Sequence, residues 1–172
     1  MRQVKSGDLD KLGILFERHK NAVYSYFYRN TFNKSACDDL MQNVFYRILI
    51  YRSRFDGYGK FTTWMYHIAH NVLVDHYKKN KTLDHAEDLT ESEYQNNLET
   101  DSNLLEKEKQ QLLVRALKHL PDEQREALTL SRFQGLKYKE IGEIQDCNEG
   151  AVKVRIFRAL AALKDIYFKL EA

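Results

Sequence analysis

The segment from Phe61 to Asn71 carries side chains suited to chemistry with nucleic acid. It reads Phe-Thr-Thr-Trp-Met-Tyr-His-Ile-Ala-His-Asn, and residues 52–82 hold six basic and two acidic side chains. Aromatic rings can stack on unpaired bases while nearby cations and amides hold the phosphate backbone. Helical spacing predicts a buried stripe formed by Phe61, Trp64, Met65, Ile68, Ala69 and Val72. The opposite face then presents Tyr66, His67, His70, Asn71, Val74 and Lys78.

The same face raises the possibility of a metal site. His67 and His70 are three residues apart, a spacing at which helical side chains can share a metal ion. No acid completes the ligand set, because Asp75 lies about a turn and a half beyond His70. We therefore expect no metal and no other cofactor. A helical-bundle metalloenzyme that uses the histidines is the alternative from a different functional class, and metal analysis of the purified protein would distinguish it.

A second candidate site lies on a helix predicted from Glu149 to about Phe168. At about 100° per residue, one sector collects the expected core residues Val152, Ile156, Ala159, Leu160 and Leu163. The other side presents Gly150, Ala151, Lys153, Val154, Arg155, Phe157 and Arg158. Apolar side chains beside cations are typical of a helix in the major groove, where they meet thymine methyls, phosphates or guanine. A groove on a partner protein is the alternative explanation for an exposed Phe157.

The elements that position this helix predict a helix-turn-helix. A short helix over Tyr138–Gln145 is separated from the second helix by Asp146, Cys147 and Asn148. Asp146 suits a left-handed turn position, Cys147 is small enough to be buried, and Asn148 can cap the second helix.

Two further helices are predicted upstream of this motif. The first is amphipathic, with Leu112, Leu113, Ala116, Leu117 and Leu120 on its apolar face, and ends before Pro121. Pro121 suits the first position of the next helix, which is expected to stop at Gly135.

Three elements are predicted ahead of the Phe61 helix. Asp8 is a candidate cap for a helix with apolar spacing at Leu9, Leu12, Leu15, Phe16 and Val23. Ser35 and Asp38 resemble a capping box for a helix that reaches about Tyr51, with Leu40, Val44, Ile48 and Tyr51 on one face. Two glycines within residues 54–60 predict a loop.

The composition indicates an all-α protein. The 172 residues include one proline and seven glycines, below the average shares of about 5% and 7%. No apolar run approaches the roughly 20 residues that cross a membrane, so no membrane insertion is expected. Two distant cysteines exclude a disulfide scaffold and suit a reducing cytoplasm.

The charge is segregated along the chain. Residues 84–108 carry nine acids and one lysine, whereas the remainder holds 26 basic and 16 acidic residues, a net of +10. A basic body suits a polyanion-binding protein. The acidic stretch is too polar to order itself. We therefore predict two small helical domains, 1–79 and 103–172, joined by a flexible acidic linker over 80–102 that proteases should cut first.

In this order, the segments resemble bacterial RNA polymerase sigma factors of the extracytoplasmic-function (ECF) group. Residues 38–45 (DDLMQNVF) are similar to the helix by which the family grips the polymerase clamp. Residues 61–71 are similar to its promoter-melting and minus-ten segment, with 55–60 as the specificity loop. Residues 120–128 and 135–144 are similar to the start of the minus-thirty-five domain, and 150–159 to its recognition helix. The resemblance covers roughly 8–79 and 104–168.

The resemblance implies three sets of contact residues. Polymerase binding is expected at Asp38, Asp39, Gln42, Asn43 and Phe45. Minus-ten DNA binding is expected at Phe55, Asp56, Gly57, Tyr58, Gly59, Lys60, Trp64, His67, His70, Asn71 and Lys78. Minus-thirty-five DNA binding is expected at Arg125, Lys137, Lys139, Ala151, Lys153, Val154, Arg155, Phe157 and Arg158.

Several positions depart from the family pattern. Asn43 replaces a usual acid, which softens the clamp contact. Lys137 replaces a Ser or Thr helix cap, at a cost of about 0.5–2 kcal/mol unless another group caps the helix. Gly142 replaces an alanine, with the fit retained at a helix cost of roughly 1 kcal/mol. Ala151 and Val154 replace hydroxyl residues, so the promoter sequence cannot be copied from relatives.

The resemblance therefore implies a cytoplasmic transcription initiation factor and not an enzyme. It would bind core RNA polymerase, through the clamp with the first domain and the flap with the second, and would recognise and open promoter DNA. An anti-sigma factor is a further expected partner. A stand-alone helix-turn-helix regulator is the competing hypothesis, and a pull-down with core polymerase would separate the two.

Overall fold

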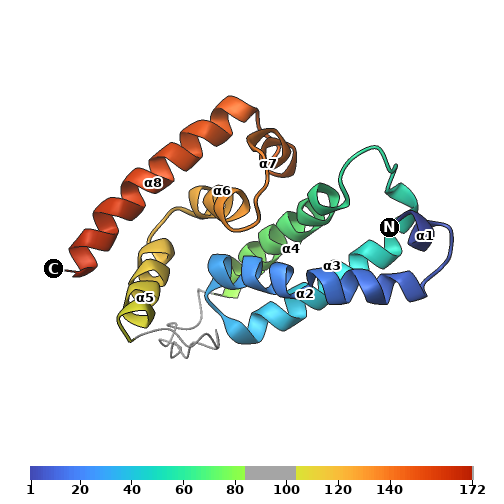
Figure 1. Ribbon diagram of the computed structural model, residues 1–172, viewed down its shortest axis with the longest axis horizontal. Coiled ribbons are helices and arrows are strands. Elements are labelled where there is room, and N and C mark those ends of the chain that lie inside the picture. The colour runs from blue at the N-terminus through green and yellow to red at the C-terminus, as the bar shows by residue number, and fades with distance from the viewer. Residues whose placement is uncertain (84–103, 172) are drawn as a thin grey trace.

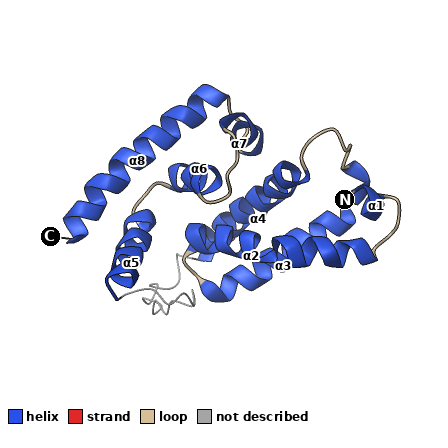
Figure 2. Ribbon diagram, viewed as in Figure 1, coloured by secondary structure: helices blue, strands red, loops and turns tan. Residues whose placement is uncertain are grey.

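The computed structural model describes residues 1–83 and 104–171, and every regular element within these ranges is helical (Figure 2). The N-terminal group comprises α1 (Arg2–Lys5), α2 (Asp10–Thr31), α3 (Lys34–Ile50), the 3-10 turn η1 (Arg52–Arg54) and α4 (Phe61–Leu83). The C-terminal group comprises α5 (Leu104–Lys118), α6 (Asp122–Arg132), α7 (Tyr138–Ile144) and α8 (Glu149–Glu171). The all-α prediction is confirmed.

The N-terminal group packs α2, α3 and α4 against one another. Their shared apolar faces supply the buried residues Val23, Tyr26, Phe27, Leu40, Val44, Ile48, Met65, Ile68, Ala69 and Val72. Tyr51 was expected on the same face of α3, but it caps the end of the helix and is exposed.

Two helix starts in this group differ from the prediction. Asn33, not Ser35, caps α3, because its side-chain oxygen accepts a hydrogen bond from the amide of Ala36 at 3.1 Å. The start of α2 follows Leu9, which makes no side-chain cap bond, so Asp8 does not act as the cap. A local sequence offers several neighbouring cap candidates, and packing selects among them.

Helix α4 continues through residues 80–83, the first four residues of the predicted linker. The prediction of a flexible linker over 84–102 lies outside the described residues, as does residue 103. The division into domains 1–79 and 103–172 stays a prediction.

The helix-turn-helix is confirmed, although Cys147 in its turn is half-buried and not buried. Asp146 has a φ of 52°, the left-handed conformation that the turn requires. Asn148 caps α8 by accepting a hydrogen bond from the amide of Ala151 at 2.8 Å. Upstream, Pro121 precedes the first residue of α6, so it acts as the cap and not as the first helical residue.

Gly142 and Lys137 show how this motif tolerates its departures. A Cβ at Gly142 would lie 2.5 Å from the carbonyl oxygen of Cys147, so this crossing has no room for alanine. The glycine keeps the fit, as expected, whereas the alanine usual in the family would force the turn to shift. At Lys137, the Glu140 carboxylate accepts a hydrogen bond from the lysine amide at 2.7 Å and replaces part of the missing cap.

The two helix groups pack together. In Figure 1, α6 lies between α8 and the helices α2 and α4, and the contacts of α2 with α6 and of α4 with α7 join the groups. Buried residues of both groups, such as Tyr26, Met65, Leu130 and Ile141, belong to one continuous hydrophobic core. The C-terminal group therefore covers one side of α4 in this structure.

Candidate nucleic-acid interfaces

The loop before α4 is anchored at its base and exposed at its tip. Phe55 is buried, with its ring 5.3 Å from that of Trp64 and 6.2 Å from that of Phe61. The Asp56 carboxylate accepts a hydrogen bond from the amide of Tyr58 at 3.0 Å, and Gly57 adopts a φ of 81°. Tyr58 is 97% exposed. The fold thus presents one aromatic ring at the tip of an ordered turn, while Phe55 has a packing role.

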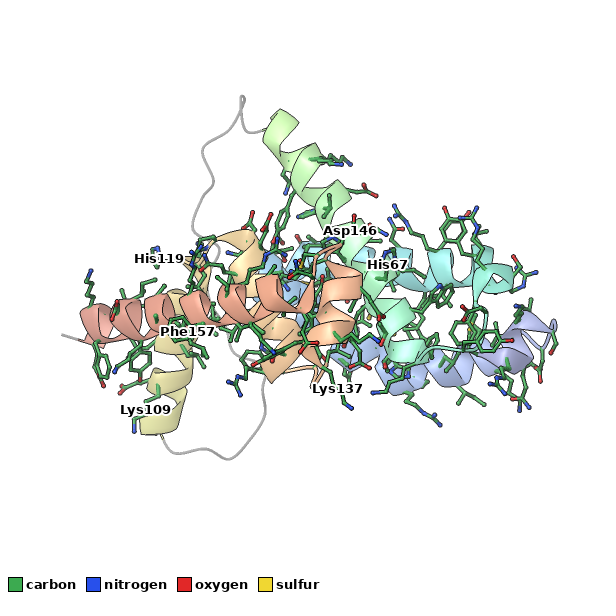
Figure 3. All side chains as sticks on the ribbon, turned by 90° about the horizontal axis from the view of Figure 1, so that it is seen from above. His67, Lys109, His119, Lys137, Asp146 and Phe157 are labelled. Carbon is green, nitrogen blue, oxygen red and sulfur yellow. The ribbon has the colours of Figure 1, made fainter. Side chains whose placement is uncertain are left out.

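Beyond the loop, α4 keeps part of its polar face open. His67, Asn71 and Lys78 are exposed, and Trp64 is half-buried. Figure 3 labels His67 on this helix. Tyr66 was expected on the open face but is buried, since its hydroxyl donates to the side-chain oxygen of Gln134 at 2.6 Å. Gln134 belongs to the C-terminal group, so the sequence of α4 by itself cannot predict this contact.

His70 is engaged by a buried acid. Its Nδ1 lies 2.9 and 3.1 Å from the two carboxylate oxygens of Glu126 on α6. The same carboxylate accepts hydrogen bonds from the Tyr26 hydroxyl and, at 2.9 Å, from the Gln145 amide. Glu126 is 5% exposed, and these four side chains come from α2, α4, α6 and the turn after α7. We call them the Glu126 cluster.

The Glu126 cluster has opposite effects on its two titratable members. Burial opposes charge on His70, but the hydrogen bond and negative charge of Glu126 outweigh it and raise the pKa of His70 above its ordinary value. Burial likewise opposes charge on Glu126, but the bond and charge of His70, followed by the bonds from Tyr26 and Gln145, lower its pKa. Both shifts favour an ion pair.

Two more of the predicted DNA contacts are tied to acids of the C-terminal group. Lys60 pairs with Glu140 at 2.9 Å across the interface. Arg155 pairs with Glu123 at 2.8 Å and donates to the side-chain oxygen of Gln145 at 3.0 Å. Because Gln145 also binds Glu126, a chain of hydrogen bonds joins α4 to α8.

Arg125 lies inside the structure, although the resemblance placed it at DNA. It is 5% exposed and donates to the carbonyl of Leu120 at 2.9 Å and to the hydroxyl of Tyr77 at 3.1 Å. It also pairs with Asp122. In this arrangement Arg125 joins α6 to α4 and is not available to a phosphate.

The outer face of α8 is open. Val154 and Phe157 are 47% and 74% exposed, and Lys153 and Arg158 are exposed beside them. Figure 3 labels Phe157 on α8 and Lys137 near the start of α7. Lys137 and Lys139 are also exposed, whereas Ala151 is half-buried. Leu160 was expected in the core but is 39% exposed, because it lies at the edge of the buried sector of Val152, Ile156 and Ala159.

A third surface runs along α3. A groove there is lined by Asp39, Gln42, Asn43, Tyr46, Arg47, Ile50 and Tyr51. Asp38 is exposed nearby, whereas Phe45 is buried with its ring 4.9 Å from that of Phe16. Sequence reasoning missed Tyr46 and Ile50, which are 64% and 50% exposed. Their spacing of four and eight residues from Gln42 held the signal.

Metal and membrane readings receive no support within residues 1–83 and 104–171. No group of three histidine, cysteine or acidic side chains there could hold a metal ion. In the same part of the chain, no helix combines the length and apolar character of a membrane span.

Comparisons with known proteins match both helix groups. Residues 15–82 match the family model of sigma-70 region 2, and residues 110–163 match that of sigma-70 region 4. The chain is 31% identical to the ECF RNA polymerase sigma factor SigM of Bacillus subtilis over 154 residues, 89% of this chain and 93% of SigM. It is 32% identical to SigW of the same organism, over 95% of this chain and 92% of SigW.

The fold has solved counterparts as well. The sigma factor RpoE of Bartonella quintana, in complex with the anti-sigma factor NepR, matches with a TM-score of 0.77 at 18% identity. That match covers 91% of this chain and 96% of RpoE. On the two family models and the curated relatives together, the chain belongs to the ECF group of sigma-70 RNA polymerase sigma factors, which are transcription initiation factors.

Proposed function

We propose that this sigma factor binds core RNA polymerase in the cytoplasm, directs it to promoters with two separate DNA-reading surfaces, and catalyses no reaction itself. The observation that carries the proposal is the outer face of α8. Phe157 and Val154 are exposed there between Lys153 and Arg158, a pattern suited to the major groove.

The first surface reads the minus-ten element as single-stranded DNA. Tyr58 at the tip of the loop offers a ring for stacking on an unpaired base, and Asn71 offers an amide for its hydrogen-bonding edge. His67 and Lys78 are exposed along the same helix, where they can hold the strand. Capture of unpaired bases stabilises the open duplex and so assists melting.

The second surface reads the minus-thirty-five element as duplex DNA. Arg158 is the candidate for a guanine contact, because its planar donors match two acceptors on one base edge. Lys153, Lys137 and Lys139 supply positive charge for bases or phosphates. Val154 and Phe157 discriminate by shape and by contact with thymine methyls.

The groove on α3 binds the polymerase clamp. Gln42, Asn43 and Asp39 give it polar contacts, and Tyr46 with Ile50 gives it the apolar centre that a stable interface needs. Asn43 and Arg47 are already joined by a hydrogen bond of 2.9 Å, and Arg47 pairs with Asp75 at 2.9 Å. These contacts hold the polar rim in place before the partner arrives.

Promoter binding requires the two helix groups to separate. His70 and Lys60, both predicted minus-ten contacts, are held by Glu126 and Glu140 of the C-terminal group. The groove on α3 lies outside this interface, so polymerase can bind it while the two helix groups are still packed together. The RpoE relative was solved with an anti-sigma factor, and a partner of that class would hold the closed arrangement.

Run-off transcription with purified core polymerase on a library of genomic promoters tests the proposal. We expect transcripts from a restricted promoter set only when the protein is added. Gln42→Ala with Tyr46→Ala should abolish these transcripts and the binding of core polymerase, whereas Arg18→Ala, an exposed change on α2, should alter neither. Sequence-specific DNA binding without any dependence on core polymerase would contradict the proposal and favour a stand-alone regulator.

A further inference from the structure

The short helix α1 lies against the loop that carries Tyr58. Val4 is fully buried and anchors this helix to the N-terminal group, with α2 and η1 as its neighbours. Two basic side chains flank Val4 in the sequence, Arg2 and Lys5. The anchor therefore fixes the place from which both cations extend.

Both cations donate to backbone carbonyls of the loop. The Lys5 ammonium donates to the carbonyl of Phe55 at 2.7 Å in a partly buried bond. The Arg2 guanidinium donates to the carbonyl of Gly57 at 3.1 Å. Hydrogen bonds with a charged donor are shorter and stronger than neutral ones. The two bonds thus hold the loop at Phe55 and Gly57, two positions in the segment that leads to Tyr58.

The loop has little backbone bonding of its own. Within the described residues, its backbone hydrogen bonds stop at the amide of Phe55, which donates to Arg52, and resume at Trp64, which donates to Lys60. Between these points the Asp56 carboxylate holds the amide of Tyr58. The carbonyl bonds from Arg2 and Lys5 are therefore a major constraint on where the tip stands.

The backbone conformation of Gly57 and its lack of a side chain allow the close approach of the Arg2 guanidinium. Its φ of 81° suits glycine, and a Cβ there would come within 3.3 Å of the Arg2 Nε atom. The guanidinium consequently lies close against the backbone at the point where the loop turns. A larger residue would displace the cation as well as strain the turn.

We propose that Arg2 and Lys5 are positioning residues for minus-ten recognition, which fix the Gly57 and Phe55 carbonyls and thereby set the position of the Tyr58 ring. The inference rests on the proposed function of the loop as a minus-ten reader. Stacking of a base on Tyr58 strengthens DNA binding most when the ring is already in position. Ordering the loop during binding would cost conformational entropy and offset that gain. Loss of either cation should then weaken the preference for one base at the minus-ten position that Tyr58 contacts.

Holoenzymes assembled from core polymerase and each variant test this on promoters with a randomised minus-ten element. Lys5→Met and Arg2→Met keep an apolar stem and remove the donor. We expect each to lower the ratio of preferred to non-preferred base at the position read by Tyr58 by about tenfold, the scale of one charged hydrogen bond. The minus-thirty-five preference should not change.

Matched variants separate positioning from charge and from folding. Lys5→Arg retains a charged donor and should restore most of the preference, and Arg18→Met removes a cation of the same helix group and should leave it intact. Thermal unfolding of each variant should show similar midpoints for Arg2→Met and Arg18→Met, because both side chains are exposed.

Other outcomes would overturn the proposal. A uniform loss of affinity across all sequences, with a shallower salt dependence, would make Arg2 and Lys5 phosphate contacts. If Tyr58→Ala changes the minus-ten preference but Lys5→Met and Arg2→Met do not, the positioning role alone is wrong. If Tyr58→Ala also changes nothing, the loop does not read the minus-ten element, and the proposed function of the loop falls with the inference.

Discussion

Asn71 and Arg158 are both exposed, and we propose that they contact DNA in different states, single-stranded and duplex. Asn71 lies on α4 beyond the loop that carries Tyr58, whereas Arg158 lies on the outer face of α8. An amide can match the edge of an unpaired base, while a guanidinium in the major groove reads a base pair in a duplex. Their substitutions should therefore affect different steps of initiation.

Asn71→Ala should reduce open-complex formation more than initial duplex binding, because unpaired bases are what the side chain can hold. Permanganate reactivity of thymines at the minus-ten region measures this step. The exposed position predicts an unchanged melting temperature for the variant protein. Equal reactivity for the wild type and Asn71→Ala would count against the role.

Arg158→Ala should cost about 1–3 kcal/mol of binding free energy and relax the preference at one base pair. Selection from a library with a randomised minus-thirty-five element, using holoenzyme, measures both. Arg158→Lys is the matched control, since it keeps the charge but loses the planar fork. A uniform loss of affinity with the same selected sequence would make Arg158 a phosphate contact.

At the scale of elements, α3 has an exposed face, which we propose binds polymerase, and a buried packing face. Gln42→Ala and Asp39→Ala should weaken binding to core polymerase without lowering the melting temperature, since both side chains are exposed. Phe45→Ala should instead destabilise the fold by about 3–5 kcal/mol, because its ring is buried against Phe16. Unchanged affinity for core polymerase in both variants would mean that Gln42 and Asp39 are solvent-exposed residues with no role in binding.

The crossing of α7 with the turn before α8 depends on Gly142. Alanine there would improve helix propensity by about 1 kcal/mol. Its Cβ, however, would lie 2.5 Å from the backbone oxygen of Cys147, and overpacking of this kind costs about 1–3 kcal/mol or more. We expect Gly142→Ala to lower the midpoint of chemical denaturation. A gain in stability would show that the turn relaxes freely.

At the scale of the whole molecule, the Glu126 cluster adds a pH-sensitive ion pair to the hydrophobic core that the two helix groups share. His70 is paired with Glu126, and both line a pocket between α4 and the C-terminal group. The other charged residues of this pocket are Lys78, Asp122, Glu123 and Arg155. Arg155 lowers the pKa of His70 and Glu123 raises it, but both effects are smaller than that of Glu126. The pKa of His70 is therefore higher in the closed arrangement than in an open one.

The direction of this shift predicts how closure depends on pH. We call the state in which the two helix groups are packed together the closed arrangement. It binds the His70 proton more tightly than the separated state does. The ion pair of His70 with Glu126 therefore stabilises closure fully below the ordinary pKa of His70, about 6.5. This stabilisation is lost as pH rises through the raised pKa of His70. On the acid side it is lost as pH falls through the lowered pKa of Glu126. Closure is thus favoured between these two values and weakened at alkaline pH.

Small-angle X-ray scattering of the free protein should show a radius of gyration that increases from about pH 6 to about pH 9. Glu126→Gln removes the charge at nearly constant shape. Its radius should be larger at pH 6 and should change less over the same range, with helix content checked by circular dichroism. A wild-type radius that is constant with pH, or identical to that of Glu126→Gln, would contradict the prediction.

Local patterns in the sequence determined the long helices, the helix-turn-helix and many of the residues on their exposed faces. The left-handed Asp146, the Asn148 cap and the exposed faces around Phe157 and Asn71 follow from helical periodicity and from side-chain preferences within a few residues. Such features depend on neighbours in the chain, so one sequence suffices to predict them.

Tertiary structure alone decided which polar residues were covered. Tyr26 and Glu126 are 100 residues apart, and Tyr66 and Gln134 are 68 residues apart, yet each pair is hydrogen-bonded. No periodicity marks such pairs, because a polar side chain on a helix looks the same whether it meets water or another helix. Only the packing of α6 and α7 on α2 and α4 shows that Tyr66, His70 and Arg125 belong to an interface.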